Sequence, residues 1–421
     1  MSFQDIRKSR RWLSAEEIRL LALLLLIVAG LLVLNIFLAH ILQGGEWFFL
    51  RWIGARAFLL EQIEPYSTEI ALRVQEVAYG RRAFGSEYPF VLNDPFQIVL
   101  LYTPLALFQD FAIARGIWML VSEAALIGTI LLAINLSEWQ PPRWLHAGLF
   151  AFGLFGYYSL NALITSSPTI ILNFLYLSVL LAIRSHSDEL AGALLFLVAY
   201  QWEAGGLFFL FIVVFIFLNH RWHILAGFGM LMAVLLVISF LVNPGWGLPY
   251  IRAVLSDWFR SANLTFGHIL STWLPDARFS IGTTVSLGLG LIVFLEWLGA
   301  VQAHFRRIVW AASLSLAATP LMGFAIFPSN HVVLILPLVL ILGLVWERWT
   351  RSRVIMVVFI LALSLLIPFG IYVRTVSVYS PLYLDLLSIL PPVAAILGLY
   401  WMRWWVLRSP RTWIDQVGIR K

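Results

Sequence analysis

Acids and arginines gather in one polar stretch of this otherwise apolar chain, residues 42–94. The charged residues of the stretch are Glu46, Arg51, Arg56, Glu61, Glu64, Glu69, Arg73, Glu76, Arg81, Arg82, Glu87 and Asp94. A carboxylate can accept the proton of an attacking hydroxyl group, and the planar guanidinium of arginine can bind two oxygens of a phosphate. Because the stretch lies directly after an apolar run, we expect any chemistry to take place beside a bilayer.

The composition of the whole chain is that of a membrane protein. Of its 421 residues, 61% are hydrophobic and 12% are charged, whereas a soluble domain carries about 25% charged residues. The net charge of +6 comes mostly from arginines in short clusters between apolar runs, so nucleic-acid binding is not indicated. The chain has no cysteine, which excludes a disulfide framework and a thiolate nucleophile. It has no nucleotide, nicotinamide or zinc-protease pattern, and we expect neither a cofactor nor a metal.

Apolar runs of the length that crosses a bilayer recur along the chain. The run 95–108 is shorter and contains Pro95 and Pro104, so we expect a broken, tilted or re-entrant helix there. The first run is too long for a signal sequence and lacks a cleavage site, so we expect a retained helix. The sequence therefore predicts an all-α polytopic bundle of about eleven to thirteen helices. The runs are 18–39, 111–136, 144–160, 168–184, 190–203, 204–219, 222–243, 281–303, 308–327, 331–348, 354–374 and 381–403.

The arginine clusters predict how the bundle is oriented, because short cytoplasmic loops are enriched in Lys and Arg. The clusters fall on one side if residues 95–108 do not cross fully; if they do cross, a later run must be broken instead. We therefore expect both termini in the cytoplasm of a cell-membrane protein. Residues 42–94 and 244–280 are then the two long outer loops.

Both outer loops have the pattern of helices that lie on a membrane surface. Residues 47–60 are apolar apart from two arginines, and a second helix with one apolar stripe is expected over 67–80. In the second loop, Tyr250, Trp258 and Trp273 are expected to be interfacial anchors. We expect the two loops to roof a cavity on the outer face.

Several short motifs resemble those of one family of membrane enzymes. They are Gly-Gly-acid-aromatic at 44–47, Gly-Ala-Arg at 54–56, Glu-Pro-Tyr at 64–66, YPFVLNDPFQIVLLYTPLALF at 88–108 and LAATPLMGFAIFPSNHVVLILPLVLIL at 316–342. This order is similar to the integral-membrane glycosyltransferases of the type C superfamily, above all glycosyltransferase family 87, the polyprenyl-phosphate-mannose-dependent mannosyltransferases. The resemblance covers residues 18–348, which we interpret as the core of a single membrane domain with further helices and a cytoplasmic tail in 349–421.

The sequence also departs from the family pattern at three places. The first-loop acid is usually Asp in the family and is Glu46 here. A Gly-Gln pair common in the middle of the family is replaced around residues 166–168, and Gln201 stands where a lysine is frequent. The first departure keeps the carboxylate and lengthens its side chain by one methylene.

The resemblance implies transfer of a hexose, expected to be mannose, from a polyprenyl-phosphate donor to a lipid or glycan acceptor on the outer face. Glu46 would be the general base at the membrane surface, and we expect it to face a cavity bounded by residues 244–280 and the turn at 328–331. The residues expected to hold the donor phosphate are Arg51, Arg56, Arg252, Arg260 and His331. Arg51 and Arg56 have a second interpretation as snorkelling anchors. His331 aligns with the family's late histidine, and its second interpretation is that it merely caps a helix.

Two further acids are candidates for the site. Asp94 precedes a proline and has the position of a turn residue, so its role as a site acid is the second interpretation. Glu203 interrupts an apolar run, and acids in such runs usually face a cavity.

Two other classes of protein remain open at this point. A secondary transporter would share the helix count, but it should carry an internal repeat with mid-membrane acids in both halves, and no repeat is evident. A polysaccharide polymerase or ligase would also use an outer cavity, but its largest loop typically lies late in the chain, whereas here the first loop is the largest.

Overall fold

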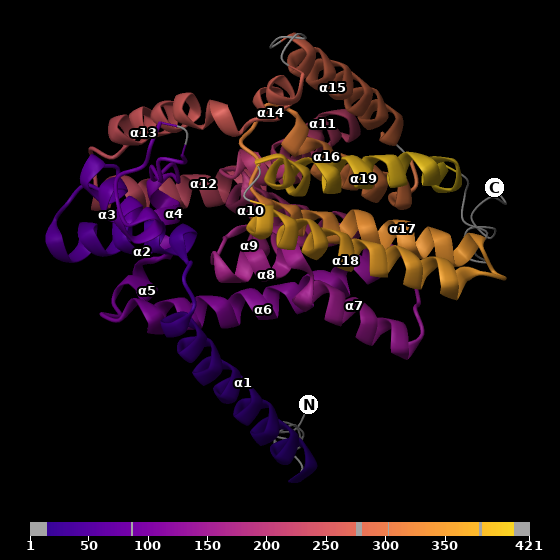
Figure 1. Ribbon diagram of the computed structural model, residues 1–421, viewed down its shortest axis with the longest axis horizontal. Helices are drawn as coiled ribbons and strands as arrows, with labels where there is room; N and C mark the ends of the chain where they lie inside the picture. The colour runs from indigo at the N-terminus through magenta and orange to yellow at the C-terminus, as the bar shows by residue number, and fades with distance from the viewer. Residues whose placement is uncertain (1–14, 86, 275–279, 302, 379–380, 408–421) are drawn as a thin grey trace, which may run out of the picture.

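The computed structural model describes residues 15–85, 87–274, 280–301, 303–378 and 381–407, and this part of the chain is a bundle of helices (Figure 1). An all-α polytopic fold is confirmed. Eight helices of the described residues are long and apolar enough to cross a membrane, one of them extended by the 3-10 turn η6 (Pro328–Leu334). The eight are α1 (Ala15–Ile41), α6 (Phe111–Leu136), α11 (Trp202–Asn219), α12 (Trp222–Val242), α15 (Ser280–Ala300), α17 (Ile335–Arg348), α18 (Arg353–Val378) and α19 (Pro381–Leu407).

The number of long helices is lower than the eleven to thirteen expected, because several apolar runs form short or bent helices. α10 (Asp188–Val198) and α16 (Phe305–Ala318) have 11 and 14 residues. α16 ends before Pro320, whose ring cannot continue a helix. α7 (Arg143–Phe155) and α8 (Tyr157–Ile164) meet at an angle of 43° and form a ninth candidate span only as a pair. α9 (Thr169–Arg184) is apolar but has only 16 residues.

The centre of the bundle is formed by α9, α16 and α17, and the outer helices leave apolar side chains uncovered. Of the span that contains α17, 83% of residues are buried, whereas 6% of the α1 span and 11% of the α18 span are. Helices that expose apolar residues in this way are suited to lipid contact. α1 packs along α6 and extends away from the rest of the bundle (Figure 1).

The first outer loop folds into the short helices that the sequence predicts. α2 (Glu46–Arg56) continues into the π-helical turn η2 (Ala57–Glu61), and α3 (Thr68–Tyr79) follows. Residues 95–108 form the broken segment that was expected, with α4 (Phe96–Leu101) and α5 (Thr103–Ala106) separated at Tyr102. In Figure 1 the helices α2, α3 and α4 gather at the end of the bundle away from the C-terminus.

α2 is more deeply packed than a helix that only rests on a membrane surface. Phe48 stacks on Trp118 of α6, and Phe96 of α4 and Tyr102 belong to the same buried cluster. Burial of such aromatic side chains stabilises each contact by a few kcal/mol, roughly 1.5–3 for a side chain of this size. The first loop therefore forms a closely packed cap on the bundle.

The second outer loop contributes α13 (Gly247–Arg260) and α14 (Phe266–Trp273), and α13 packs against the first loop. Asn93 donates a hydrogen bond from Nδ2 to Oδ2 of Asp257 over 2.8 Å. The rings of Tyr66 and Tyr250 lie 5.8 Å apart between their centroids. Because the two loops touch, they lie at the same end of the bundle.

Candidate functional site

A cavity of about 780 Å³ lies between the two outer loops and the adjoining ends of the bundle. One wall is formed by Asn93 of the first loop, residues 200–203 at the start of α11 and the inner face of α13. The opposite wall is formed by residues 322–325 and the first turns of α15. The size falls in the usual range of small-molecule sites, about 300–1,000 Å³. We call this space the α13 cavity.

Two acids, Glu203 and Asp257, line the α13 cavity and are close enough to repel each other. Asp257 is 5% exposed, and while its Oδ2 accepts the bond from Asn93, its Oδ1 accepts none from the described residues. Burial raises the pKa of Asp257, and the neighbouring Tyr88 and Asn93 oppose that shift. Glu203 is half-buried in the first turn of α11 and forms no hydrogen bond or ion pair within the described part of the chain.

Arg51 and Asp94, which the sequence placed among the candidate site residues, form a buried ion pair. Nε of Arg51 lies 2.7 Å from Oδ2 of Asp94, and Nη2 donates to Oδ1 over 3.0 Å. The side chains are 2% and 1% exposed. Burial raises the pKa of Asp94, and the adjacent guanidinium opposes that shift. Arg51 therefore does not snorkel to lipid headgroups, and its fork is occupied by Asp94.

The other predicted phosphate-binding arginines differ in how free they are. Arg56 donates from Nη1 to the backbone oxygens of Ala106 and Phe108, over 3.0 and 3.1 Å, and so caps the end of α5. Arg252 and Arg260 are exposed on α13 and form no hydrogen bond or ion pair within the described residues. Of the four arginines, only the last two are without any hydrogen bond to the described residues, and Arg56 keeps Nε and Nη2 unoccupied.

Glu46 is the first residue of α2 and enters the helix through a turn that requires glycine. Gly44 and Gly45 have φ of 119° and 85°, which side-chain-bearing residues rarely adopt. A Cβ on Gly45 would lie 2.7 Å from Nε of Arg115. Burial raises the pKa of Glu46, and its backbone hydrogen bond and the charge of Arg115 oppose that shift. The glycine pair thus allows Arg115 to sit against the turn that carries Glu46.

Arg115 fixes the junction between α1 and α2. Its guanidinium is 1% exposed and donates to backbone oxygens of Leu42 (2.8 Å), Ala39 (3.2 Å) and Ile164 (2.7 Å) and to Oγ of Ser166 (3.3 Å). These contacts tie the end of α1 to the end of α8. The turn with Glu46 is therefore held at a fixed place beside α8.

Glu46 does not line the α13 cavity, although we expected it to face a space bounded by residues 244–280; in that space the structure has Glu203 and Asp257 instead. The contacts of the neighbours of Glu46 lead instead to the other expected boundary, the turn at residues 328–331. Its neighbour Trp47 packs on Phe327, with centroids 4.8 Å apart, and Phe327 directly precedes η6. The general-base role of Glu46 stays a prediction, with α8 and η6 as the elements beside it.

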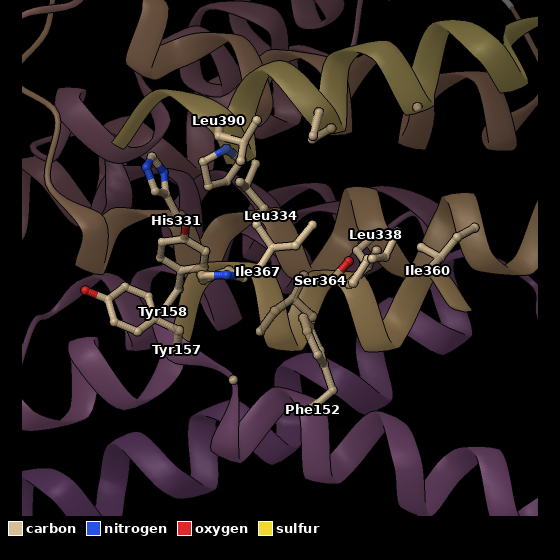
Figure 2. A pocket seen from close by; sticks show the side chains of 18 of the residues that line it. Phe152, Tyr157, Tyr158, His331, Leu334, Leu338, Ile360, Ser364, Ile367 and Leu390 are labelled. Atoms are coloured by element: carbon tan, nitrogen blue, oxygen red, sulfur yellow. The ribbon is translucent and has the colours of Figure 1, made fainter. Parts of the chain in front are cut away.

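α8 and η6 line one end of a second, apolar cavity of about 410 Å³ between α7, α8, α17, α18 and α19. Figure 2 shows Tyr157, Tyr158 and His331 at one end and apolar side chains such as Leu338 and Ile360 toward the other. We call this space the apolar cavity. α18, which forms one wall of the apolar cavity, exposes most of its side chains, as suits a helix in contact with lipid.

His331 is buried at the same end of the apolar cavity as Tyr157 and Tyr158, which we call the polar end. Its Nε2 lies 2.7 Å from the backbone oxygen of Ser388, and its ring meets that of Tyr158 edge-on at 5.2 Å. Since a carbonyl oxygen only accepts, Nε2 carries a proton, and in the neutral ring Nδ1 is then an acceptor. Nδ1 is buried without a hydrogen-bond partner among the described residues. His331 thus keeps one unsatisfied polar atom at the polar end of the cavity, and its role in holding the phosphate stays a prediction.

Two important residues escaped the sequence interpretation. Arg115 is a lone charge in the apolar run 111–136, and the rule that charges in such runs are costly and functional could have found it. Asp257 lies on the same face of α13 as Tyr250, Val254 and Ser261, but its partner Asn93 is 164 residues away in sequence. No local pattern predicts that contact.

Searches against known protein families, curated proteins and solved structures find no match for this chain.

Proposed function

We propose that this protein is a membrane glycosyltransferase that moves a hexose, expected to be mannose, from a polyprenyl-phosphate donor to an acceptor on the outer face of the membrane. One observation carries the proposal: the turn with the half-buried carboxylate of Glu46 is held against the last residue of α8 and against Phe327, directly before η6. The first turn of α8 and η6 line the apolar cavity. The motif resemblance of residues 44–66 supports it independently.

The apolar cavity suits the isoprenoid tail of the donor. Its lining is almost wholly aliphatic and aromatic, and polar groups occur mainly at the polar end, where Tyr157, Tyr158 and His331 lie. A lipid-linked sugar has the same division, with an apolar chain and a polar head. In this arrangement the tail occupies the cavity, and the sugar phosphate projects from the polar end toward α2.

Glu46 would act on the acceptor. The acceptor oxygen forms a bond to the anomeric carbon while the bond from that carbon to the phosphate oxygen breaks. The hydroxyl proton passes to Glu46, and the electron pair leaves with the polyprenyl phosphate. A carboxylate whose pKa is raised by burial is a better proton acceptor than an exposed one. The fixed positive charge of Arg115 lies nearby and favours the departing phosphate.

The first test is transfer by the purified protein in liposomes. Labelled polyprenyl-phosphate mannose, glucose and galactose are supplied separately with an extract of envelope lipids and glycans, and label leaving the donor is measured. We expect transfer from one donor, and a loss of about a hundredfold to ten-thousandfold in Glu46→Gln, because Gln keeps the shape of Glu and cannot accept a proton.

Glu76→Gln is the matched control, since Glu76 is an exposed acid on α3 in the same loop. It should transfer sugar at the unmodified rate. No transfer from any of the three donors, or an unchanged rate in Glu46→Gln, would overturn the proposal.

A further inference from the structure

The α13 cavity is not used by the reaction as described, yet it has the features of a binding site. Its two acids form no ion pair with the described residues, and no Lys, Arg or His occurs among the residues that line it. Glu203 also has no hydrogen-bond partner in this part of the chain, whereas Asp257 accepts a bond from Asn93. Polar groups that are withdrawn from solvent without a partner are rare in folded proteins, and the half-buried Glu203 calls for an explanation such as an absent ligand.

Aromatic side chains form much of the remaining wall. Trp202 and Trp258 line the cavity and are 42% and 61% exposed, and Trp258 meets Phe324 edge-on at 6.2 Å. Exposed indole faces of this kind can stack on the C–H faces of a sugar ring. The amide of Gln201, which forms no side-chain hydrogen bond in the described structure, adds a donor and an acceptor.

The charge of the cavity selects among possible ligands. Carboxylates accept hydrogen bonds from hydroxyl groups, and such charge-assisted bonds are among the stronger ones in proteins. The same carboxylates repel phosphates and uronic acids. A ligand with many hydroxyl groups and no negative charge fits this combination.

The α13 cavity lies close to Glu46 but does not include it. Tyr88 contacts both sides: its ring packs on Trp47, next to Glu46, with centroids 5.1 Å apart, and it neighbours Asp257 of the cavity wall. A sugar in the cavity is therefore a neighbour of the reacting unit and not the reacting unit itself.

We propose that the α13 cavity binds an uncharged sugar unit of a glycan acceptor, held by Glu203 and Asp257 and stacked on Trp202 or Trp258, while another unit of the same glycan is presented to Glu46. The acceptor is accordingly a neutral oligosaccharide or polysaccharide of at least two units. The identification of the bound sugar as an acceptor rests on the proposed function. The binding of a neutral sugar is inferred from the cavity alone.

The test measures the binding of sugars to the purified full-length protein by calorimetry, in the absence of donor. The probes are neutral trisaccharides of mannose, glucose and galactose, and a trisaccharide of uronic acid. We expect a neutral trisaccharide to bind and the acidic one not to bind. Glu203→Gln and Asp257→Asn should each weaken binding by roughly tenfold or more, with Trp258→Ala as a third variant and Glu76→Gln as the matched control.

The outcomes separate this inference from the proposed function. The inference would be overturned if no neutral trisaccharide binds or if the acidic one binds equally well. It would also be overturned if the affinity is unchanged in correctly folded Glu203→Gln, Asp257→Asn and Trp258→Ala. If transfer depends on Glu46 but these variants leave acceptor KM unchanged, the transferase proposal stands and the glycan site falls. If sugars bind but no donor is turned over, the sugar-binding site stands and the transferase proposal falls.

Discussion

The charged residues at the outer end of the molecule divide into satisfied and unsatisfied groups. Arg51 and Asp94 neutralise each other in a bidentate pair that is almost fully buried. Glu46, Glu203 and Asp257 form no ion pair within the described ranges. Unpaired acids in poorly solvated places cost stability, and proteins keep such costly groups mainly where they act on a ligand. The distinction favours the second group as the functional residues.

The pH dependence of transfer tests the state of Glu46. A general base works when it is ionised, so the rate falls as pH decreases through the pKa of the base. Because burial raises that pKa, the acid limb of kcat/KM should lie above 4.5, the usual value for Glu. The residual rate of Glu46→Gln should lack this limb. A limb at or below 4.5, or one retained in the variant, would count against Glu46.

The same shift has a consequence for stability. A carboxyl whose pKa is raised on folding is stabilising when protonated, and its ionisation destabilises the folded state as pH rises above the unfolded pKa. At neutral pH, Glu46→Gln removes that ionised group. Its thermal unfolding midpoint should therefore be no lower than that of the unmodified protein, so that loss of transfer cannot be attributed to unfolding.

At the scale of the elements, the Gly44–Gly45 turn between α1 and α2 decides where Glu46 lies. Gly45→Ala adds a Cβ 2.7 Å from Nε of Arg115 at a φ of 85°, so the turn or the guanidinium must move. We expect transfer to fall at least tenfold, together with a loss of stability of about 1–2 kcal/mol. Both are measured on the reconstituted protein.

Gly85→Ala is the control for this substitution. An added Cβ at Gly85 meets nothing within 4 Å, and its φ is not in the left-handed region. It should leave transfer and the unfolding midpoint unchanged. Normal transfer by Gly45→Ala would show that the position of the turn does not matter.

Local patterns predicted the elements better than their contacts. The limits of α6, the helices of the first loop and the break in 95–108 follow from apolar periodicity and prolines. The early ends of α10 and α16 were missed, because apolar composition continues past the point where the helical backbone stops. Arg51–Asp94 and Asn93–Asp257 join residues 43 and 164 positions apart. Such pairs are decided by tertiary packing, which one sequence does not reveal.

At the scale of the whole molecule, contact between the two outer loops fixes their common side. The chain has no native cysteine, so single cysteines can be labelled cleanly. Glu76→Cys and Asn263→Cys, at exposed positions in the two loops, should react with a membrane-impermeant maleimide in intact cells. Arg351→Cys, between α17 and α18, should react only after permeabilisation. Labelling of the two loop cysteines from opposite sides would contradict the shared outer face.

The position of a bound donor tests the central claim most directly. The measurement is an electron cryomicroscopy structure of the full-length protein in lipid nanodiscs with a non-transferable polyprenyl-phosphate hexose analogue. The account predicts isoprenoid density in the apolar cavity of α8, α17, α18 and α19, with the phosphate at its polar end and the anomeric carbon facing Glu46. A phosphate bound away from both α2 and η6, or an ion or solute held at mid-membrane and no lipid in the apolar cavity, would contradict it.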